Sequence, residues 1–233
     1  MRSTYLLVML LLAFISCKKA GSIDSSVVST KDSISVSDTN EIDDYSDFTF
    51  KDENERADTL KKYVELALTV NDKTYCDRMI FNSFPNSFDG MRKLFGFDNV
   101  TKEAPLYIWP IGDNVIKYFG SILSIPKDTY YEKCINICVN GYWEADNIRQ
   151  AFGFHKRLSE DTKSVCEVLS NRTDEEIISV FRFIFDGPHP KNDDNALIYD
   201  DLSAKLKVND SRLSDLLKTA YEKVLLQDDG HGK

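Results

Sequence analysis

Cysteine and histidine are the side chains of this chain with the most reactive chemistry, and both are few. The cysteines are Cys17, Cys76, Cys134, Cys138 and Cys166, and the histidines are His155, His189 and His231. No histidine has metal-ligand spacing, and the chain has no nucleophile elbow, phosphate-binding glycine loop or CxxC pair. The sequence therefore predicts no catalytic site, no metal site and no cofactor, and we expect a protein that is not an enzyme.

Cys17 is distinguished by the residues before it. Arg2 precedes an apolar run from Tyr5 to Ile15, and the small residue Ser16 stands directly before the cysteine. This run of 11 residues is too short for a membrane span, which takes about 20 residues. The order is that of a secretory signal peptide. We expect residues 1–16 to be a lipoprotein signal peptide and Cys17 to be the lipidation site.

The site before Cys17 departs from the common lipoprotein pattern at one position, because Phe14 stands where leucine is usual. Cleavage elsewhere, giving an ordinary secreted protein, is the alternative. If Cys17 is acylated, several acyl chains give a stable anchor, since each buried methylene contributes only about 0.8 kcal/mol. The predicted location is the outer membrane, at the cell surface, with the membrane itself as a partner through acylated Cys17.

Residues 17–50 change in composition toward serine and then toward aspartate and glutamate. Such a polar, self-repelling segment predicts a disordered tether that holds a folded body away from the headgroups. Residues 228–233 are predicted to be a disordered tail.

The four cysteines after Cys17 leave two alternatives open. An exported protein favours oxidation, so Cys76, Cys134, Cys138 and Cys166 could form disulfides. Cys76 and Cys134, however, each lie on an apolar helical face, where thiols behave as small hydrophobic groups. We give buried free thiols some preference over one or more disulfides.

From residue 55 onward, apolar residues recur with helical spacing. The last stripe runs from Leu213 to Leu225 behind a cap at Asp210 or Ser211, whereas the segment from Ile177 to Phe185 is apolar nearly all round. Scarce glycine and proline also favour helices. The predicted fold is all-α, with tandem helical repeat units packed as one or two four-helix-type bundles.

Self-similarity at an offset of 55 to 58 residues supports the repeat. Lys62-Tyr63 returns as Lys117-Tyr118, Cys76 as Cys134, and Phe95-Gly96-Phe97 as Phe152-Gly153-Phe154. A period of this length marks a supersecondary unit that cannot bury its apolar face alone. The predicted units are residues 51–112, residues 113–158, and residues 159–227 for a third and a partial fourth.

The Phe-Gly-Phe segments predict a structural role for their glycines. Gly96 and Gly153 suit the left-handed position after a helix, where a Cβ would be strained. In that motif the next residue packs back on the last turn, so Phe97 should contact Met91 and Phe154 should contact Ile148. We predict that both glycines are helix caps.

The aromatic residues are the feature of the sequence that suggests a bound ligand. Spaces between bundle helices hold apolar ligands, and the candidate binding residues are Phe81, Phe84, Phe95, Phe119, Phe152 and Phe181. The alternative, which we weigh more heavily, is that these rings pack as ordinary core.

An export signal with a relaxed lipidation site, a Ser/Asp-rich tether and helical units ending in Phe-Gly-Phe together resemble the BTA-type repeat-domain surface lipoproteins of relapsing-fever Borrelia. The resemblance rests on residues 55 to 227. It implies an all-α fold on the cell surface and makes binding of a fatty acid or a sterol an expected activity.

The net charge is −9, which repels phosphate backbones and argues against a nucleic-acid partner. The predicted function is thus a non-catalytic surface lipoprotein at the host or vector interface that binds a fatty acid or sterol between helices. The alternative is an adhesin or immune-evasion protein that binds a host protein with the surface of the bundle. A hydrolase of unrecognised type is a weaker third reading, because no acid/base pair stands out.

Overall fold

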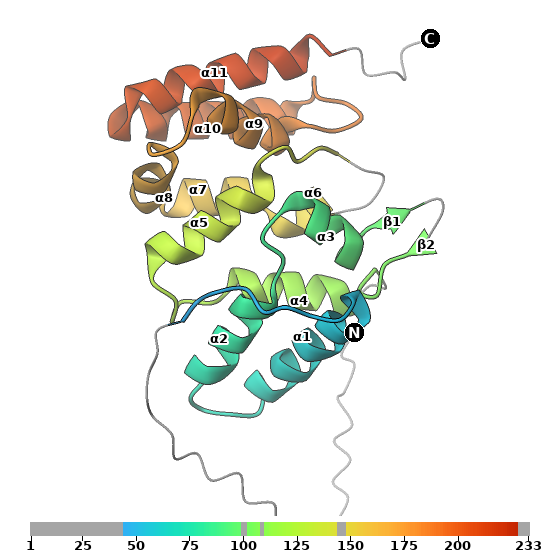
Figure 1. Cartoon of the computed structure of the whole chain (residues 1–233). Coiled ribbons are helices and arrows are strands. Elements are labelled where there is room, and N and C mark those ends of the chain that lie inside the picture. Colours follow the sequence, from blue (N-terminus) through green and yellow to red (C-terminus); the bar gives the residue numbers. More distant parts are fainter. Residues whose placement is uncertain (1–43, 99–101, 108–109, 144–147, 228–233) are drawn as a thin grey trace, which may run out of the picture. The chain divides into compact units, whose positions relative to one another are not determined.

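The computed structural model describes residues 44–98, 102–107, 110–143 and 148–227 (Figure 1). The predicted signal peptide, Cys17, residues 18–43 of the predicted tether, and the tail 228–233 lie outside the described residues. The helices are α1 (Glu53–Ala67), α2 (Thr74–Ser83), α3 (Phe88–Phe95), α4 (Ile111–Gly120), α5 (Lys127–Cys138), α6 (Ile148–Phe152), α7 (Phe154–Glu160), α8 (Thr162–Leu169), α9 (Asp174–Phe185), α10 (Asp193–Asn209) and α11 (Ser211–Leu225).

The predicted all-α class is confirmed, with one small addition. Two-residue strands β1 (Phe97–Asp98) and β2 (Lys102–Glu103) pair in antiparallel fashion, with Phe97 opposite Glu103. This ladder was not predicted. It follows α3 directly and places the segment 104–107 against α3, because the Leu106 amide donates to the Leu94 carbonyl.

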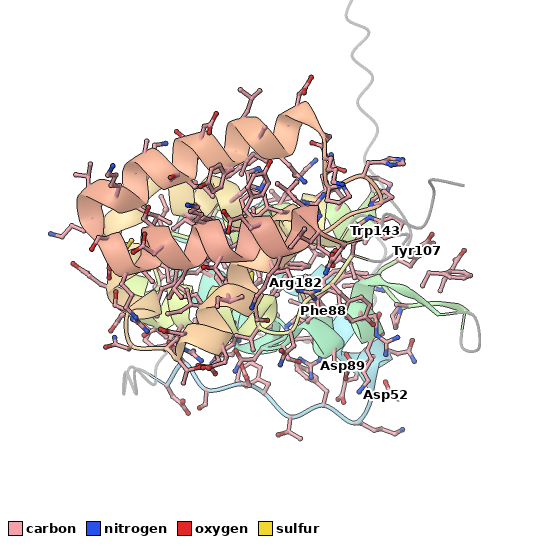
Figure 2. All side chains as sticks on the ribbon, turned by 90° about the horizontal axis from the view of Figure 1, so that it is seen from above. Asp52, Phe88, Asp89, Tyr107, Trp143 and Arg182 are labelled. Carbon is pink, nitrogen blue, oxygen red and sulfur yellow. The ribbon has the colours of Figure 1, made fainter. Side chains whose placement is uncertain are left out.

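Several helices begin at side chains that accept amide hydrogen bonds from the first turn. Asp52, labelled in Figure 2, caps α1, and Thr173 with Glu176 forms a capping box at α9. Asp210 caps α11 through the Leu213 amide, as the sequence predicts. Such caps satisfy amides that have no partner within the helix.

The buried apolar side chains from Ala57 in α1 to Val224 in α11 form one contiguous cluster. Helix α5 lies between the two ends of this cluster: it contacts α3 on one side and both α8 and α9 on the other, and α9 packs in turn on α11 (Figure 1). The segment from Ile177 to Phe185 is buried on nearly all sides, which agrees with its apolar character nearly all round. Figure 2 shows α10 and α11 lying side by side.

The repeat organisation stays a prediction. Helices α1, α2 and α3 do follow one another as α4, α5 and α6 do, and Cys76 and Cys134 are both buried in the second helix of their segment. The glycines that close the two segments nevertheless have different conformations.

Gly153 has the predicted left-handed backbone, with φ 57° and ψ 43°. Gly96 ends α3, and its amide donates to the Arg92 carbonyl, but its φ of −89° and ψ of −175° are extended. The left-handed prediction is therefore wrong for Gly96. The reason is the β1–β2 ladder, which takes the chain onward in extended form, so that Phe97 is 41% exposed and lies against the Tyr107 ring.

Residues 44–50, which we call the strap, fall within the predicted disordered tether of residues 17–50, but in the structure they are bonded to the folded body. The Phe48 amide donates to the Asn82 carbonyl at 2.8 Å, and the Asn82 side-chain amide donates to the Asp44 carbonyl at 3.0 Å. The Tyr45 ring meets the Phe81 ring edge-on. The strap thus belongs to the folded body.

Gly153 offers a test of the left-handed link between α6 and α7. We expect Gly153→Ala to lower the free energy of unfolding by about 1–2 kcal/mol, because a Cβ is strained in the left-handed region. Urea denaturation gives this value. Gly187→Ala is the control, since its Cβ would meet only the Arg149 side chain at 3.7 Å; equal losses in both variants would contradict a conformational cause.

Candidate functional site

The six predicted phenylalanines are all buried, and five of them meet in one aromatic cluster. Phe84 stacks on Phe119 with 3.9 Å between ring centroids, and Phe95 lies 5.7 Å from Phe84. Phe81 and Phe152 stand 6.3 and 6.4 Å from Phe119. Phe181 is fully buried in α9, and no ring pair found among the described residues joins it to the other five.

Most of this cluster is packed core, and its edges open on two surface depressions. The larger, which we call the α4–α6 groove, has a volume of about 930 Å³. Its apolar lining residues are Phe95, Leu106, Tyr107, Ile116, Ile148, Ala151 and Phe152, of which Tyr107 and Ala151 are half-buried and the other five are buried. Its charged residues are Glu103, Asp113, Lys117, Lys156, Arg157 and Glu160. Two of the six predicted residues, Phe95 and Phe152, therefore line it.

Arg157 is the most unusual residue of the groove. Its Nε donates to the Tyr130 hydroxyl at 3.1 Å, its Nη1 donates to the Phe152 carbonyl, and its guanidinium lies 4.7 Å from the centre of the Phe152 ring. Among the residues that the structure describes, no carboxylate forms an ion pair with it. A largely buried cation normally has a counter-charge, so this guanidinium has capacity for an anion.

Gly120 makes room for Arg157. A Cβ at this position would stand 2.5 Å from the Nη2 atom. The bare backbone of the last residue of α4 therefore lets the guanidinium come close to the helix, at the wall of the groove. Lys156, which is exposed, and Lys117, which pairs with Asp113 at 2.6 Å, add positive charge at the rim.

His155 precedes Lys156 and Arg157 and carries no metal or catalytic partner among the described residues. Burial, together with the charges of Lys156, Arg149 and Arg157, lowers its pKa from 6.5 to about 4. The side chain is consequently neutral at pH 7.

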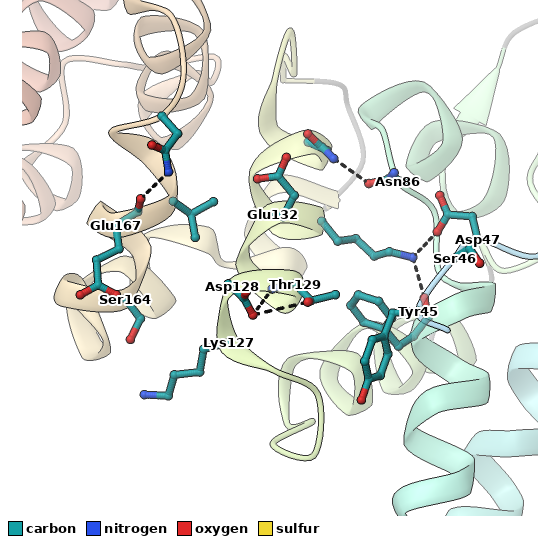
Figure 3. Close-up of a pocket in the computed structure, with 15 residues that line it drawn as sticks. Tyr45, Ser46, Asp47, Asn86, Lys127, Asp128, Thr129, Glu132, Ser164 and Glu167 are labelled. Carbon is teal, nitrogen blue, oxygen red and sulfur yellow. Dashed lines mark hydrogen bonds and ion pairs between the residues drawn. The ribbon is translucent and has the colours of Figure 1, made fainter. Parts of the chain in front are cut away.

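The second depression, the strap pocket, has a volume of about 660 Å³ and lies between the strap, α5 and α8 (Figure 3). Lys133 reaches from α5 toward the strap at its edge. The buried ammonium contacts the Asp47 carboxylate at 2.5 Å and donates to the Phe81 carbonyl at 2.6 Å and the Phe84 carbonyl at 3.2 Å. Burial lowers the Lys133 pKa, and Asp47 acts against that shift.

The remaining lining of the strap pocket is mostly polar and already hydrogen-bonded. The Asn136 amide donates to Asn86, Arg172 pairs with Glu132, and the Asn171 amide donates to the Glu167 carbonyl. Only Phe81 of the six predicted residues lines this pocket. An apolar ligand is therefore better matched by the α4–α6 groove.

The four described cysteines are buried free thiols. This is the alternative that we prefer from the sequence. Burial raises the pKa of Cys134 to about 11 and that of Cys166 to about 11, and it raises the Cys138 pKa as well. These thiols are protonated at neutral pH, so they are poor nucleophiles.

Within the described ranges, no group of three or more His, Cys, Asp and Glu side chains is placed to hold a metal ion. Nor does any helix there have the length and apolar character that a membrane crossing needs. Neither protein-family models nor curated proteins nor solved structures gave a match to this chain.

Sequence reasoning missed Arg157. A single arginine just after the Phe152-Gly153-Phe154 segment is indistinguishable in sequence from a solvated surface residue. Its burial comes from α4 and from Tyr130 of α5, which are distant in the chain. No local pattern could have identified it.

The Lys133–Asp47 contact predicts coupling between the strap and α5. We expect Asp47→Ala to lower the free energy of unfolding by about 2 kcal/mol, since it leaves a buried ammonium without a counter-charge. In a Lys133→Met background, Asp47→Ala should leave the free energy of unfolding almost unchanged. A double-mutant cycle, measured by urea denaturation, gives the coupling energy between the two side chains.

Glu167→Ala serves as the control for that cycle, because this exposed carboxylate pairs with Lys163 only at 4.0 Å. Its removal should cost less than about 0.5 kcal/mol. An Asp47→Ala loss of the same size in both backgrounds would show that the ion pair does not hold the strap.

The His155 pKa predicts a pH dependence of stability. Because the folded-state pKa of about 4 lies below 6.5, the unfolded chain takes up the proton first, and the free energy of unfolding falls as the pH drops from 6.5 toward 4. Urea denaturation across this range should show the decline in the wild type and a flatter profile in His155→Gln. An unchanged profile in the variant would contradict the assignment.

Proposed function

We propose that this chain is a non-catalytic lipoprotein of the outer-membrane surface, anchored by acylated Cys17, that binds a fatty acid or a sterol in the α4–α6 groove. The anchor and location are supported by the signal-like residues 1–16 and by the resemblance to BTA-type surface lipoproteins. Ligand binding is supported by the groove itself.

The observation that carries the ligand proposal is an apolar lining beside a guanidinium that has no carboxylate partner among the described residues. Phe95, Leu106, Ile116 and Phe152 supply aliphatic and aromatic carbon, and Arg157 stands at the same groove. A volume of about 930 Å³ lies within the range of about 300–1,000 Å³ that is typical of small-molecule sites.

This pairing favours an amphiphile with one negative end. A hydrocarbon chain would cover the apolar surface, and a carboxylate would accept charge-assisted hydrogen bonds from Arg157. Lys156 at the rim would add attraction. A sterol would gain the apolar contacts alone, so a fatty acid is the preferred ligand.

Titration of the delipidated chain, carrying Cys17→Ser to remove the acyl anchor, should show saturable binding of labelled palmitate. Hexadecanol, which has the same chain length without the carboxylate, should bind about tenfold more weakly, because a hydrogen bond to a charged group contributes about 1.5–3 kcal/mol. Cholesterol is the third probe.

The matched variants are Ala151→Phe and Ala204→Phe. Ala151 is partly buried and lines the groove, so a phenyl ring there should fill it and weaken palmitate binding at least about tenfold. Ala204 is exposed on α10, and the same substitution should leave binding unchanged. No saturable binding of palmitate or cholesterol at micromolar protein would remove the proposal.

A further inference from the structure

Tyr130 stands behind the Arg157 guanidinium, outside the α4–α6 groove. This tyrosine belongs to α5 and is buried, and it lines neither the groove nor the strap pocket. Its hydroxyl accepts from the Arg157 Nε atom at 3.1 Å and donates to the Phe119 carbonyl at 3.2 Å. The hydroxyl therefore links the guanidinium to the end of α4.

The direction of these two hydrogen bonds is fixed. The Phe119 carbonyl lies in the last turn of α4, where carbonyls have no partner within the helix. A tyrosine has one O–H hydrogen, and Tyr130 donates it to this carbonyl, which leaves the oxygen lone pairs to face Arg157. Burial raises the Tyr130 pKa above its usual value of 10, so the hydroxyl keeps its proton at neutral pH.

Arg157 divides its three guanidinium nitrogens between the fold and the groove. Nε donates to the Tyr130 hydroxyl, and Nη1 donates to the Phe152 carbonyl at the end of α6. Nη2 has no acceptor among the described residues, yet it is not enclosed in the protein, and Arg157 lines the groove. A purely structural role, which closes the ends of two helices, accounts for Nε and Nη1 but does not use Nη2.

The Tyr130 ring is itself held by the aromatic core. It stacks on Phe119 with 5.2 Å between centroids and meets the Tyr131 ring edge-on at 5.4 Å. The position of its hydroxyl is therefore set before any ligand arrives, and with it the position of the guanidinium. A donor that is ordered in advance loses little conformational freedom when a head group binds.

We infer that Tyr130 is a positioning residue, which gives the α4–α6 groove its preference for a carboxylate head group by holding Arg157 with Nη2 toward the ligand. Tyr130 does not touch the ligand itself. Without its hydroxyl, the guanidinium loses one of its two anchors, while the apolar lining of the groove stays as it is. The inference rests on the fatty-acid binding proposed above and assigns its selectivity to a residue outside the groove.

Tyr131 provides a matched control on the same helix. It is the next residue of α5, it is buried, and it lines neither the groove nor the strap pocket. Its hydroxyl donates to the Asp161 carboxylate at 2.9 Å. Tyr131→Phe thus removes the same atom as Tyr130→Phe but leaves the anchors of Arg157 in place.

Titration of the delipidated Cys17→Ser chain with palmitate and hexadecanol tests the inference. Tyr130→Phe should weaken palmitate binding about threefold to tenfold, as expected for the loss of one hydrogen bond, and should leave hexadecanol binding unchanged. Tyr131→Phe should bind both probes as the parent does. In an Arg157→Met background, Tyr130→Phe should cause no further loss of palmitate binding, because the hydroxyl then has no guanidinium to hold.

A measurement without ligand tests the hydrogen bond itself. In NMR spectra of the nitrogen-labelled chain, the Arg157 Nε–H proton should exchange slowly with water in the parent and in Tyr131→Phe, and markedly faster in Tyr130→Phe. Equal exchange rates in the parent and in Tyr130→Phe would overturn the inference.

The binding results separate the inference from the proposed function. Palmitate binding that survives Tyr130→Phe at full strength would overturn the inference and leave the proposed function standing. Equal losses of palmitate and hexadecanol binding would also overturn it, since Tyr130 would then support the groove as a whole. A parent chain that binds neither probe would remove the proposed function and the inference together.

Discussion

The stack of Phe84 on Phe119 is the contact around which the first half of the body is organised. Phe84 caps the end of α2, and Phe119 belongs to α4, so the two rings, 3.9 Å apart and nearly parallel, join elements from the two predicted repeat units. Around Phe119 lie Phe81, Tyr130 and Phe152, from α2, α5 and α6. Aromatic pairs of this kind contribute about 0.5–1.5 kcal/mol each beyond the burial of their surface.

This arrangement explains why the same residues line the surface depressions and hold the fold together. Phe152 packs toward Phe119 on one side and borders the α4–α6 groove on the other. Phe81 likewise lies in the cluster and at the edge of the strap pocket. A ligand in the groove would therefore rest on rings whose positions the core has already set, with little side-chain freedom left to lose.

Helices and caps could be predicted from the sequence because their causes are local. Helix α9 is an example: its apolar spacing runs from Ile177 to Phe185, and its capping box joins Thr173 to Glu176, so both signals lie within the helix or at its first turn. Gly96 could not be predicted, because its conformation depends on pairing between β1 and β2 across a turn. The order of the strap could not be predicted from its composition either. Tyr45 is an aromatic residue within an acidic segment, and its partner Phe81 is far along the chain.

The buried Lys133 and the partly buried Arg157 could not be identified from the sequence, for the same reason. Lys133 receives its counter-charge from Asp47, and Arg157 receives neutral acceptors from Tyr130 and Phe152. Neither set of contacts produces a periodic pattern in the sequence. Burial of charge depends on what distant segments bring to it, so such residues become visible only when the chain is folded.

The strap has a mechanical consequence. The chain does not enter α1 directly: residues 44–50 first run past α2 and α5, held by Asn82 and Lys133. A force applied at residue 44 would therefore load these contacts in shear before it reached the first helix. If the chain is anchored through Cys17 as proposed, drag would be borne by α2 through Asn82 and by α5 through the Lys133–Asp47 ion pair, and not by the first turn of α1.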